Sequence, residues 1–328
     1  MNFKEYIVSK PGLRYFFLGG KGGVGKTAVA AGMAYYFSEK LGKKTLISST
    51  NPVHSLSSVF AQDLWGKGVQ KIGGTDNLYA IEIDISETIA RYKRDIRDKI
   101  LTFLKYADIP LNPEPFVDIA TTNPAFEESA MFDDMIDLIL KGEFDAYVFD
   151  TAPVAHTYRL LGMSKVYDLW LRKMVKSREE ALSLKVKLSF RKEKIVQELK
   201  KDPLLATLLD TRQRTEGGRK LLTASENTAF FFVTLPLALP IAVIERFIVW
   251  VEAFNIPIGG VIVNGVLPKE QFDMANTSSY IVNKVKEQDR YLEIINNKFP
   301  GLVRAYIPLF ETEVAGLNTI TRVAEALG

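Results

Sequence analysis

The amino-acid sequence predicts an α/β protein with a doubly wound, mostly parallel sheet and an inserted α-helical subdomain. Short, nearly continuous apolar runs alternate with segments of helical periodicity along most of the 328 residues. Such runs are typical of parallel strands that are buried on both faces. The alternation favours right-handed crossovers, which place the active edge of the sheet at the carboxyl ends of the strands. Two long helical stretches interrupt the alternation and predict the insert.

The expected strands begin near the N-terminus. Residues 14–19 form a short apolar run that ends in glycines, and an apolar helical segment over residues 26–41 follows it. Strand, glycine loop and helix is the natural interpretation of this order. Six later runs have the same apolar character, at residues 43–50, 78–84, 146–150, 229–236, 258–264 and 303–309.

The two interrupting stretches are helical by their periodicity. In the first, apolar side chains recur at helical spacing from Ile89 to Leu104. The second contains four leucines on one helical face, preceded by a run rich in lysine and arginine. That run fits a solvated helix face, an acidic partner or lipid headgroups. We therefore expect one α/β domain built from residues 1–85, 141–163 and 225–328, and one helical insert built from residues 86–140 and 164–224.

Composition excludes several classes of site. The chain has no cysteine, which rules out disulfides, cysteine-bound zinc or iron–sulfur centres and a thiol nucleophile. A net charge of +3 is too small to indicate a nucleic-acid binder. No apolar run approaches the roughly 20 residues of a membrane span, and the N-terminal segment lacks the apolar core of a signal peptide. We therefore expect a cytoplasmic protein.

A phosphate-binding loop is predicted directly after the first strand. The sequence GKGGVGKT matches the pattern G-x-x-x-x-G-K-[ST] between an apolar run and a helix, as such a loop requires. Its glycines allow backbone N–H groups to turn inward around phosphate oxygens, and the following helix adds its positive dipole end. Lys26 would reach the β- and γ-phosphates, and the Thr27 hydroxyl would be a Mg²⁺ ligand. The other residues expected to contact nucleotide here are Gly20, Lys21, Gly22, Gly23, Val24, Gly25 and Ala28.

An aspartate at a strand end supplies the second half of this site. The run AYVFD ends in Asp150, whose carboxylate would face the metal shell, through water, at the carboxyl edge of the sheet. A guanine-binding site typically has an Asn-Lys-x-Asp loop, and the nearest match, NKVK at residues 283–286, lacks the aspartate. The sequence therefore predicts ATP and Mg²⁺ as the ligands.

Five motifs occur in order and at compatible separations. They are GKGGVGKT (20–27), SSTNPVHSLS (48–57), FDTAPVAHTYRLL (149–161), VIVNGVLP (261–268) and IPLFETEVAGLNTI (307–320). Together they resemble the ArsA-type ATPases, the group that includes arsenite-pump ATPase subunits and the factors that deliver tail-anchored membrane proteins. The resemblance spans almost the whole chain and is weakest in the helical insert. It implies a P-loop NTPase fold with a deviant phosphate loop, and a homodimer as the working unit.

The resemblance assigns roles that the residues alone leave open. In that family an early lysine of the loop crosses the homodimer interface to contact nucleotide in the partner subunit, and Lys21 matches its position. From the residues alone, Lys21 is also consistent with a solvated loop lysine. Asn264 matches the asparagine that reads adenine, although by composition it is also consistent with a turn residue after a strand. Pro308 and Leu309 match residues that line the base.

The resemblance also implies two switch segments, one around Asn51 to Ser57 and one around Asp150 to Leu161. The two histidines of the chain fall one in each segment, either as switch residues or as ordinary loop residues. The expected switch residues are Pro52, His54, Ser55, Thr151, Ala152, Pro153 and His156.

The first switch departs from the family pattern. Family members read Ser-Thr-Asp-Pro, with the aspartate positioning or activating the attacking water, whereas this chain has Asn51. An amide can hydrogen-bond a water but cannot accept its proton, and general-base help is typically worth about 10²–10⁴-fold. We therefore expect slow hydrolysis with ATP and Mg²⁺ binding intact. The substitution either was made to trap the ATP-bound state or belongs to a natural member that works as a slow switch.

Missing cysteines are the second departure. Arsenite-pump subunits bind metalloid through cysteines, and many targeting factors join their dimer with zinc held by a C-x-x-C pair. The corresponding stretch of this chain, residues 276–292, has no cysteine. Thiolate binding of As(III) is therefore ruled out, and no zinc is expected. The chain holds a single ATPase unit, so a composite site takes a second, identical chain.

Three functions follow from these features. The first is a homodimer that closes around two ATP–Mg²⁺ and aligns its helical inserts into a groove. The groove would hold the transmembrane helix of a tail-anchored client. This function would involve a membrane receptor and peripheral contact with the membrane. An energising subunit of an anion or metalloid pump is weakened by the missing cysteines. A positioning ATPase of the partition or septum-site kind is opposed by the modest charge and by a C-terminus that is not a basic amphipathic helix. The candidate groove residues, which equally fit a core of the insert, are Trp170, Met174, Leu204, Leu205, Leu208 and Leu209.

Overall fold

The fold is that of a computed structural model, which describes residues 1–49, 55–106, 112, 114–115, 118, 126–150, 173, 176, 180, 203–273 and 277–328. The chain divides into two compact units. The first consists of Met1–Asp84, Ile139–Tyr158 and Leu222–Gly328, and the second consists of Ile85–Leu138 and Arg159–Leu221. Both units therefore draw on segments that are far apart in the sequence.

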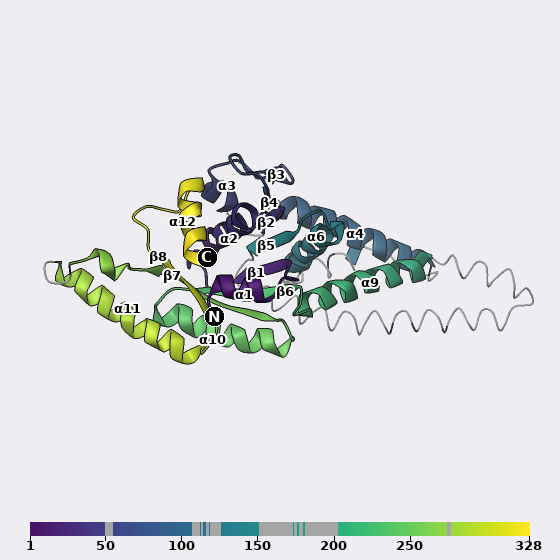
Figure 1. The fold of residues 1–328 in the computed structure, drawn as a ribbon. Helices are drawn as coiled ribbons and strands as arrows, with labels where there is room; N and C mark the ends of the chain where they lie inside the picture. Colours follow the sequence, from purple (N-terminus) through teal and green to yellow (C-terminus); the bar gives the residue numbers. More distant parts are fainter. Residues whose placement is uncertain are drawn as a thin grey trace, which may run out of the picture. The chain divides into compact units, whose positions relative to one another are not determined.

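An eight-stranded sheet organises the first unit (Figure 1). The strands lie side by side in the order β3 (Gln70–Lys71), β4 (Leu78–Glu82), β2 (Thr45–Ser49), β5 (Ala146–Asp150), β1 (Tyr15–Gly19), β6 (Thr228–Thr234), β7 (Ile258–Val266) and β8 (Val303–Pro308). Neighbouring strands are parallel except for β3 and β4, which pair antiparallel. The prediction of a doubly wound, mostly parallel α/β sheet is therefore confirmed.

Helices cover both faces of this sheet. They are α1 (Phe3–Ser9), α2 (Lys26–Tyr35) with its π-helical continuation η1 (Tyr36–Lys40), α3 (Ser55–Phe60), α10 (Ala238–Ala253), α11 (Ser279–Lys298) and α12 (Leu317–Leu327), with a 3₁₀ turn η2 (Lys269–Gln271) before α11. Side chains of α1, α2, α3 and α12 share one apolar core with Phe16, Val148 and Phe231 of the strands. Figure 1 shows α10 and α11 on the opposite side, where α10 packs against β6 and β7 and α11 packs against α10.

Aromatic rings fill the second face at the centre of the sheet. Phe17 of β1 stacks on Phe149 of β5 with ring centroids 4.8 Å apart, and Phe230 of β6 lies on its other side at 6.4 Å. The neighbouring residue Phe16 belongs to the opposite core. The central strands are thus buried on both faces, which is why they appear in the sequence as continuous apolar runs.

Two short elements of the first unit are absent from the sequence prediction. Strand β3 has only two residues, so it carries no periodicity that could be detected. Helix α1 opens with a capping box, in which the side chains of Asn2 and Glu5 each accept a main-chain N–H from the other residue. This Asn-x-x-Glu spacing is a usable sequence signal for a helix start.

The second unit is helical where the structure describes it. Its helices are α4 (Ile85–Tyr106), most of α6 (Phe126–Lys141) and most of α9 (Pro203–Thr223). Helices α4 and α6 pack together, since the Thr88 hydroxyl donates to Asp134 Oδ2 at 2.7 Å and the rings of Tyr92 and Phe126 lie 5.1 Å apart. Among the described helices, none combines the length and apolarity needed to cross a bilayer.

Candidate nucleotide-binding site

The predicted phosphate loop connects β1 to α2 at the carboxyl edge of the sheet. Two of its glycines have no room for a side chain. A Cβ on Gly20 would lie 2.4 Å from the Val233 carbonyl oxygen of β6, and a Cβ on Gly25 would lie 2.2 Å from Asn264 Nδ2 of β7. Gly25 also has φ +84°, in the left-handed region that favours glycine. The loop is therefore held closely against the ends of β6 and β7.

The two lysines of the loop have different environments. Lys26 is the first residue of α2, and its Nζ donates to the Lys21 carbonyl oxygen at 3.3 Å, across the loop. Burial lowers the pKa of Lys26, and the charge of Asp150 opposes that change. In the part of the chain that the structure describes, the ammonium of Lys21 has one long contact, 3.5 Å to the carbonyl oxygen of the next residue, Gly22. Lys26 thus lies in the interior of the loop, and Lys21 lies at its surface.

Asp150 ends β5 beside this loop. Its neighbours in register are Leu18 of β1 and Ser49 of β2. The carboxylate is almost fully buried, and its Oδ2 accepts hydrogen bonds from the Thr27 hydroxyl at 2.7 Å and the Ser49 hydroxyl at 3.2 Å. Among the described residues no group donates to its Oδ1. Burial raises the pKa of Asp150, while the hydrogen bond from Thr27 and the charge of Lys26 oppose the rise.

These groups have the chemistry of a Mg²⁺ site. Mg²⁺ prefers oxygen ligands and is usually held by one or two protein groups together with substrate phosphates. The Thr27 hydroxyl and the Asp150 carboxylate are adjacent oxygens at the end of the phosphate loop, where α2 begins. The buried Oδ1, to which no described residue donates, offers a further acceptor for a metal-bound water. The residues present therefore fit the ion.

Two polar residues of this region are not among the predicted site residues. Ser49 joins Asp150 to the start of α3, since its Oγ lies 3.4 Å from Ser55 Oγ. Glu82, the last residue of β4, is buried and accepts main-chain N–H groups from the first turn of α3. A glutamate inside the otherwise apolar run LYAIE is the signal that could have identified Glu82. Ser49 lies in the motif SSTNPVHSLS, and that position is the signal that could have identified it.

The residues expected at the base lie at the ends of β7 and β8. The Asn264 amide donates to the Val24 carbonyl oxygen of the phosphate loop at 2.9 Å. Pro308 ends β8, and the exposed Leu309 donates its main-chain N–H to the Val266 carbonyl oxygen at 2.8 Å. The structure thus brings Asn264 against the loop, while its contact with adenine stays a prediction.

The other predicted loop residues have clear positions. Ala28 is in the first turn of α2, and Val24 is buried. A Cβ on Gly22 or Gly23 would meet no neighbour within 4 Å. These two glycines border open space, which suits the approach of a phosphate group to the backbone.

Most predicted switch residues lie outside the described residues. They are Asn51, Pro52, His54, Thr151, Ala152, Pro153 and His156. Ser55 is described and begins α3 beside Ser49. The roles of all these residues stay predictions.

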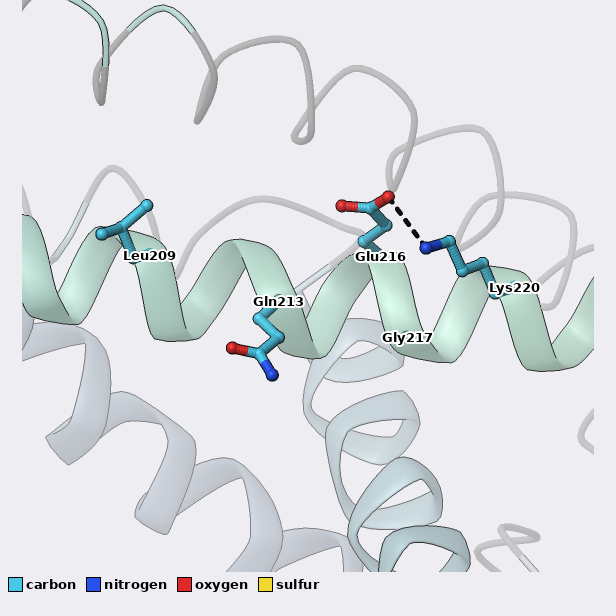
Figure 2. A pocket seen from close by; sticks show the side chains of 5 residues that line it. All are labelled: Leu209, Gln213, Glu216, Gly217 and Lys220. Atoms are coloured by element: carbon cyan, nitrogen blue, oxygen red, sulfur yellow. Dashed lines mark ion pairs between the residues drawn. The ribbon is translucent and has the colours of Figure 1, made fainter.

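Some of the candidate groove residues are described by the structure and others lie outside the described residues. Trp170 and Met174 lie outside the described residues, and Leu204, Leu205 and Leu208 lie on α9. Leu209 is exposed and borders a pocket of about 490 Å³. Figure 2 shows the residues that line this pocket, among them Glu216 and Lys220, which form an ion pair with an N–O distance of 3.3 Å. The other residues that line it are Gln213 and Gly217.

Asp150→Asn is expected to raise the Tm of the nucleotide-free protein at pH 7–8 by about 2–5 °C. The native pKa of Asp150 is raised, so its charged form destabilises the fold once the pH exceeds the unfolded value of about 3.9. The gain should therefore grow as pH rises from about 4 through the native pKa, and shrink as pH falls. Thermal melts from pH 4.5 to 8 measure it. Asp145→Asn is the control, because Asp145 is an exposed aspartate just before β5, and this variant should show no such gain. A lower Tm for Asp150→Asn than for the wild-type protein at pH 8 would contradict the prediction.

The class of protein follows from the fold and from this site. A glycine loop between β1 and a helix, with a threonine and a strand-end aspartate in contact, defines a P-loop nucleoside triphosphatase. Comparison with known families is consistent with this class. The family model of the ArsA ATPases, described as anion-transporting ATPases, matches residues 13–328, and the chain belongs to this family. Family membership makes it an ATPase.

Similar proteins cover nearly the whole chain. "ATPase GET3C" of Arabidopsis thaliana is 32% identical over 97% of this chain and 83% of its own length. "ATPase ASNA1 homolog 2" of Paramecium tetraurelia is 30% identical over 98% of this chain and 95% of its own length. "Putative arsenical pump-driving ATPase 2" of Aquifex aeolicus (strain VF5) is 30% identical over 96% of this chain and 99% of its own length. All three names describe an ATPase, and the third also names an arsenical pump.

Proposed function

We propose that this chain is an ATP-dependent homodimeric switch that binds and targets tail-anchored membrane proteins. The contact between Thr27 and Asp150 supports the nucleotide part of the proposal, because a hydroxyl and a carboxylate side by side are oxygen ligands of the kind that a phosphate-bound Mg²⁺ uses. The names of the GET3 and ASNA1 relatives support the targeting branch of the family. ATP hydrolysis would drive the change between closed and open dimers.

The chain's own residues would bind the triphosphate in one orientation. Backbone N–H groups of the loop and of the first turn of α2 would surround the phosphate oxygens, with the helix dipole behind them. Lys26, now bonded across the loop, would turn its ammonium to the β- and γ-phosphates. Thr27, directly, and Asp150, through water, would hold Mg²⁺, which supplies charge neutralisation at the γ-phosphate.

Hydrolysis in this chain would be slow because of Asn51. The amide would hold the attacking water without accepting its proton, so the site would lack the general base that an aspartate supplies. Binding would be kept, because Lys26, Thr27 and Asp150 are the residues that a P-loop uses for phosphate and metal. The ATP-bound state would therefore persist.

The second subunit would complete the site. The exposed ammonium of Lys21 would contact the nucleotide of the partner, so that ATP joins two identical chains. Closure of the dimer would bring two helical units together around the client's transmembrane helix. The exposed Leu209 and the pocket beside it on α9 would belong to that groove. Release of the client would take place at a membrane receptor.

Co-expression tests the targeting function. The chain is produced with a tagged membrane protein that has one C-terminal span, and the tag is purified without detergent. We expect a soluble complex that contains both proteins and is retained with a non-hydrolysable ATP analogue. The control client lacks its C-terminal span and should not retain the chain. Repeated absence of the complex with the full client would contradict the proposal.

The name of the Aquifex aeolicus relative favours a second candidate, the energising ATPase of an anion or metalloid pump. The absence of cysteine argues against thiolate binding of As(III) in this chain. Stimulation of ATP hydrolysis by arsenite or antimonite separates the two candidates. The targeting factor should show none, whereas a pump subunit should be stimulated.

A further inference from the structure

Glu82 is a buried residue whose carboxylate, among the described residues, accepts hydrogen bonds from one short helix. It is 1% exposed and ends β4. Its Oε1 accepts the Leu56 main-chain N–H at 2.8 Å, and its Oε2 accepts the Ser57 main-chain N–H at 3.3 Å together with the Ser57 hydroxyl. These donors belong to the first turn of α3, so Glu82 satisfies N–H groups that a helix start leaves unpaired. Charge-assisted bonds of this kind fix geometry more firmly than neutral ones.

The same turn of α3 touches the nucleotide site. Ser55, the first residue of α3, has its Oγ 3.4 Å from Ser49 Oγ, and Ser49 donates to Asp150 Oδ2 at 3.2 Å. Ser49 is the register partner of Glu82 on one side and of Asp150 on the other. One row across three adjacent strands therefore carries two carboxylates with a serine between them. The start of α3 is bonded to Glu82 at one end of this row and, through Ser55, to the serine in its middle, which itself donates to Asp150.

We propose that Glu82 is a positioning residue for ATP hydrolysis, which holds the first turn of α3 so that Ser55 stays against Ser49, the residue that donates to the Asp150 carboxylate. The inference rests on the proposed nucleotide site, and it adds a residue that touches neither nucleotide nor metal. Stability alone does not account for a glutamate here. Burying a carboxylate is costly, and a helix of six residues gains little from one cap. The buried carboxylate is better explained by the position that it imposes on the first turn of α3.

Glu82→Gln tests this role with little change in shape. The amide oxygen can still accept one N–H from α3, but the amide nitrogen faces a main-chain donor and cannot replace the second bond. We expect the single-turnover rate of ATP hydrolysis to fall at least fivefold, while the Kd for ATP–Mg²⁺ changes less than threefold. Hydrogen exchange of the α3 amides should become at least tenfold faster, with the rest of the sheet unchanged.

Glu39→Gln is the matched control. Its carboxylate also accepts two main-chain N–H groups, from Asp76 and Asn77, but at the opposite end of β4. This variant should keep the wild-type hydrolysis rate. The double variant Glu82→Gln with Ser55→Ala should be no slower than the slower single variant, because both act through the same turn.

Three outcomes would overturn the proposal. The first is a Glu82→Gln rate within twofold of wild type. The second is a loss of rate that Glu39→Gln reproduces, since it would mark a general effect on the fold. The third is a tenfold weaker Kd for ATP–Mg²⁺ with an unchanged rate at saturation, which would assign Glu82 to binding. If the wild-type chain itself fails to hydrolyse ATP, the proposed function fails, and the role of Glu82 fails with it.

Discussion

Asn51→Asp is expected to raise the single-turnover rate of ATP hydrolysis at least tenfold. The aspartate would accept a proton from the attacking water, which the amide cannot do, and such general-base help is typically worth about 10²–10⁴-fold. The Kd for ATP should stay within about threefold of the wild-type value, because the phosphate and metal groups are unchanged. Rapid mixing of excess protein with labelled ATP, followed by quench and separation of ADP, measures the rate.

Asn51→Gln is the control for this prediction. It keeps an amide at the position and should not accelerate hydrolysis. If both variants were accelerated equally, the gain would come from altered packing and not from a base. If Asn51→Asp left the rate unchanged, Asn51 would have no part in the mechanism and the expectation of a slow enzyme would be wrong.

Lys21→Ala is expected to abolish ATP-dependent dimerisation. Lys21 lies at the surface of the loop, and its side chain contacts just Gly22 among the described residues, at 3.5 Å, so its removal should leave the loop intact in each monomer. Two chains that each place an ammonium on the partner's nucleotide would lose both charge-assisted contacts, each worth about 1.5–3 kcal/mol. Their sum predicts a weakening of the dimer by at least about 10²-fold. Sedimentation velocity with a non-hydrolysable ATP analogue and Mg²⁺ measures the change.

Lys26→Ala separates the two lysines of the loop. Lys26 donates across the loop from the start of α2 and is expected to bind phosphate within its own subunit. Its variant should lose ATP binding itself, whereas Lys21→Ala should bind ATP as a monomer with a Kd close to that of the wild-type monomer. A Lys21→Ala protein that still dimerises with ATP would remove the cross-subunit role.

The sheet was predictable because its central strands are buried on both faces. On one face of the sheet lie the stacked rings of Phe17, Phe149 and Phe230, while Phe16 faces the core on the other side. The sequence of each central strand is therefore an unbroken apolar run. The antiparallel edge strand β3 has two residues and leaves no such trace. Pairing partners such as β1 and β6 are set by contacts between distant segments, which a local pattern does not encode.

The phosphate side of the site was predictable because its residues form one continuous motif. Lys26 and Thr27 follow from spacing alone, and Asp150 follows from a strand end. The links from Ser49 to Asp150 and from Glu82 to α3 depend on strand register, which places residues far apart in sequence in one row. The contact between Asn264 and Val24 likewise joins opposite ends of the chain.

That contact and the pairing of β1 have a consequence for synthesis of the chain. The phosphate loop is made early, but the strand that flanks β1 on one side begins only at Thr228, and the amide that supports the loop is Asn264. The segments of the second, helical unit end at Leu221 and are therefore translated before Thr228 and Asn264. During synthesis, all residues of the helical unit are therefore made while the nucleotide site is still incomplete. ATP cannot yet bind to that site and stabilise the nascent chain. We expect nucleotide to protect the protein against proteolysis only after release of a chain extending past β7.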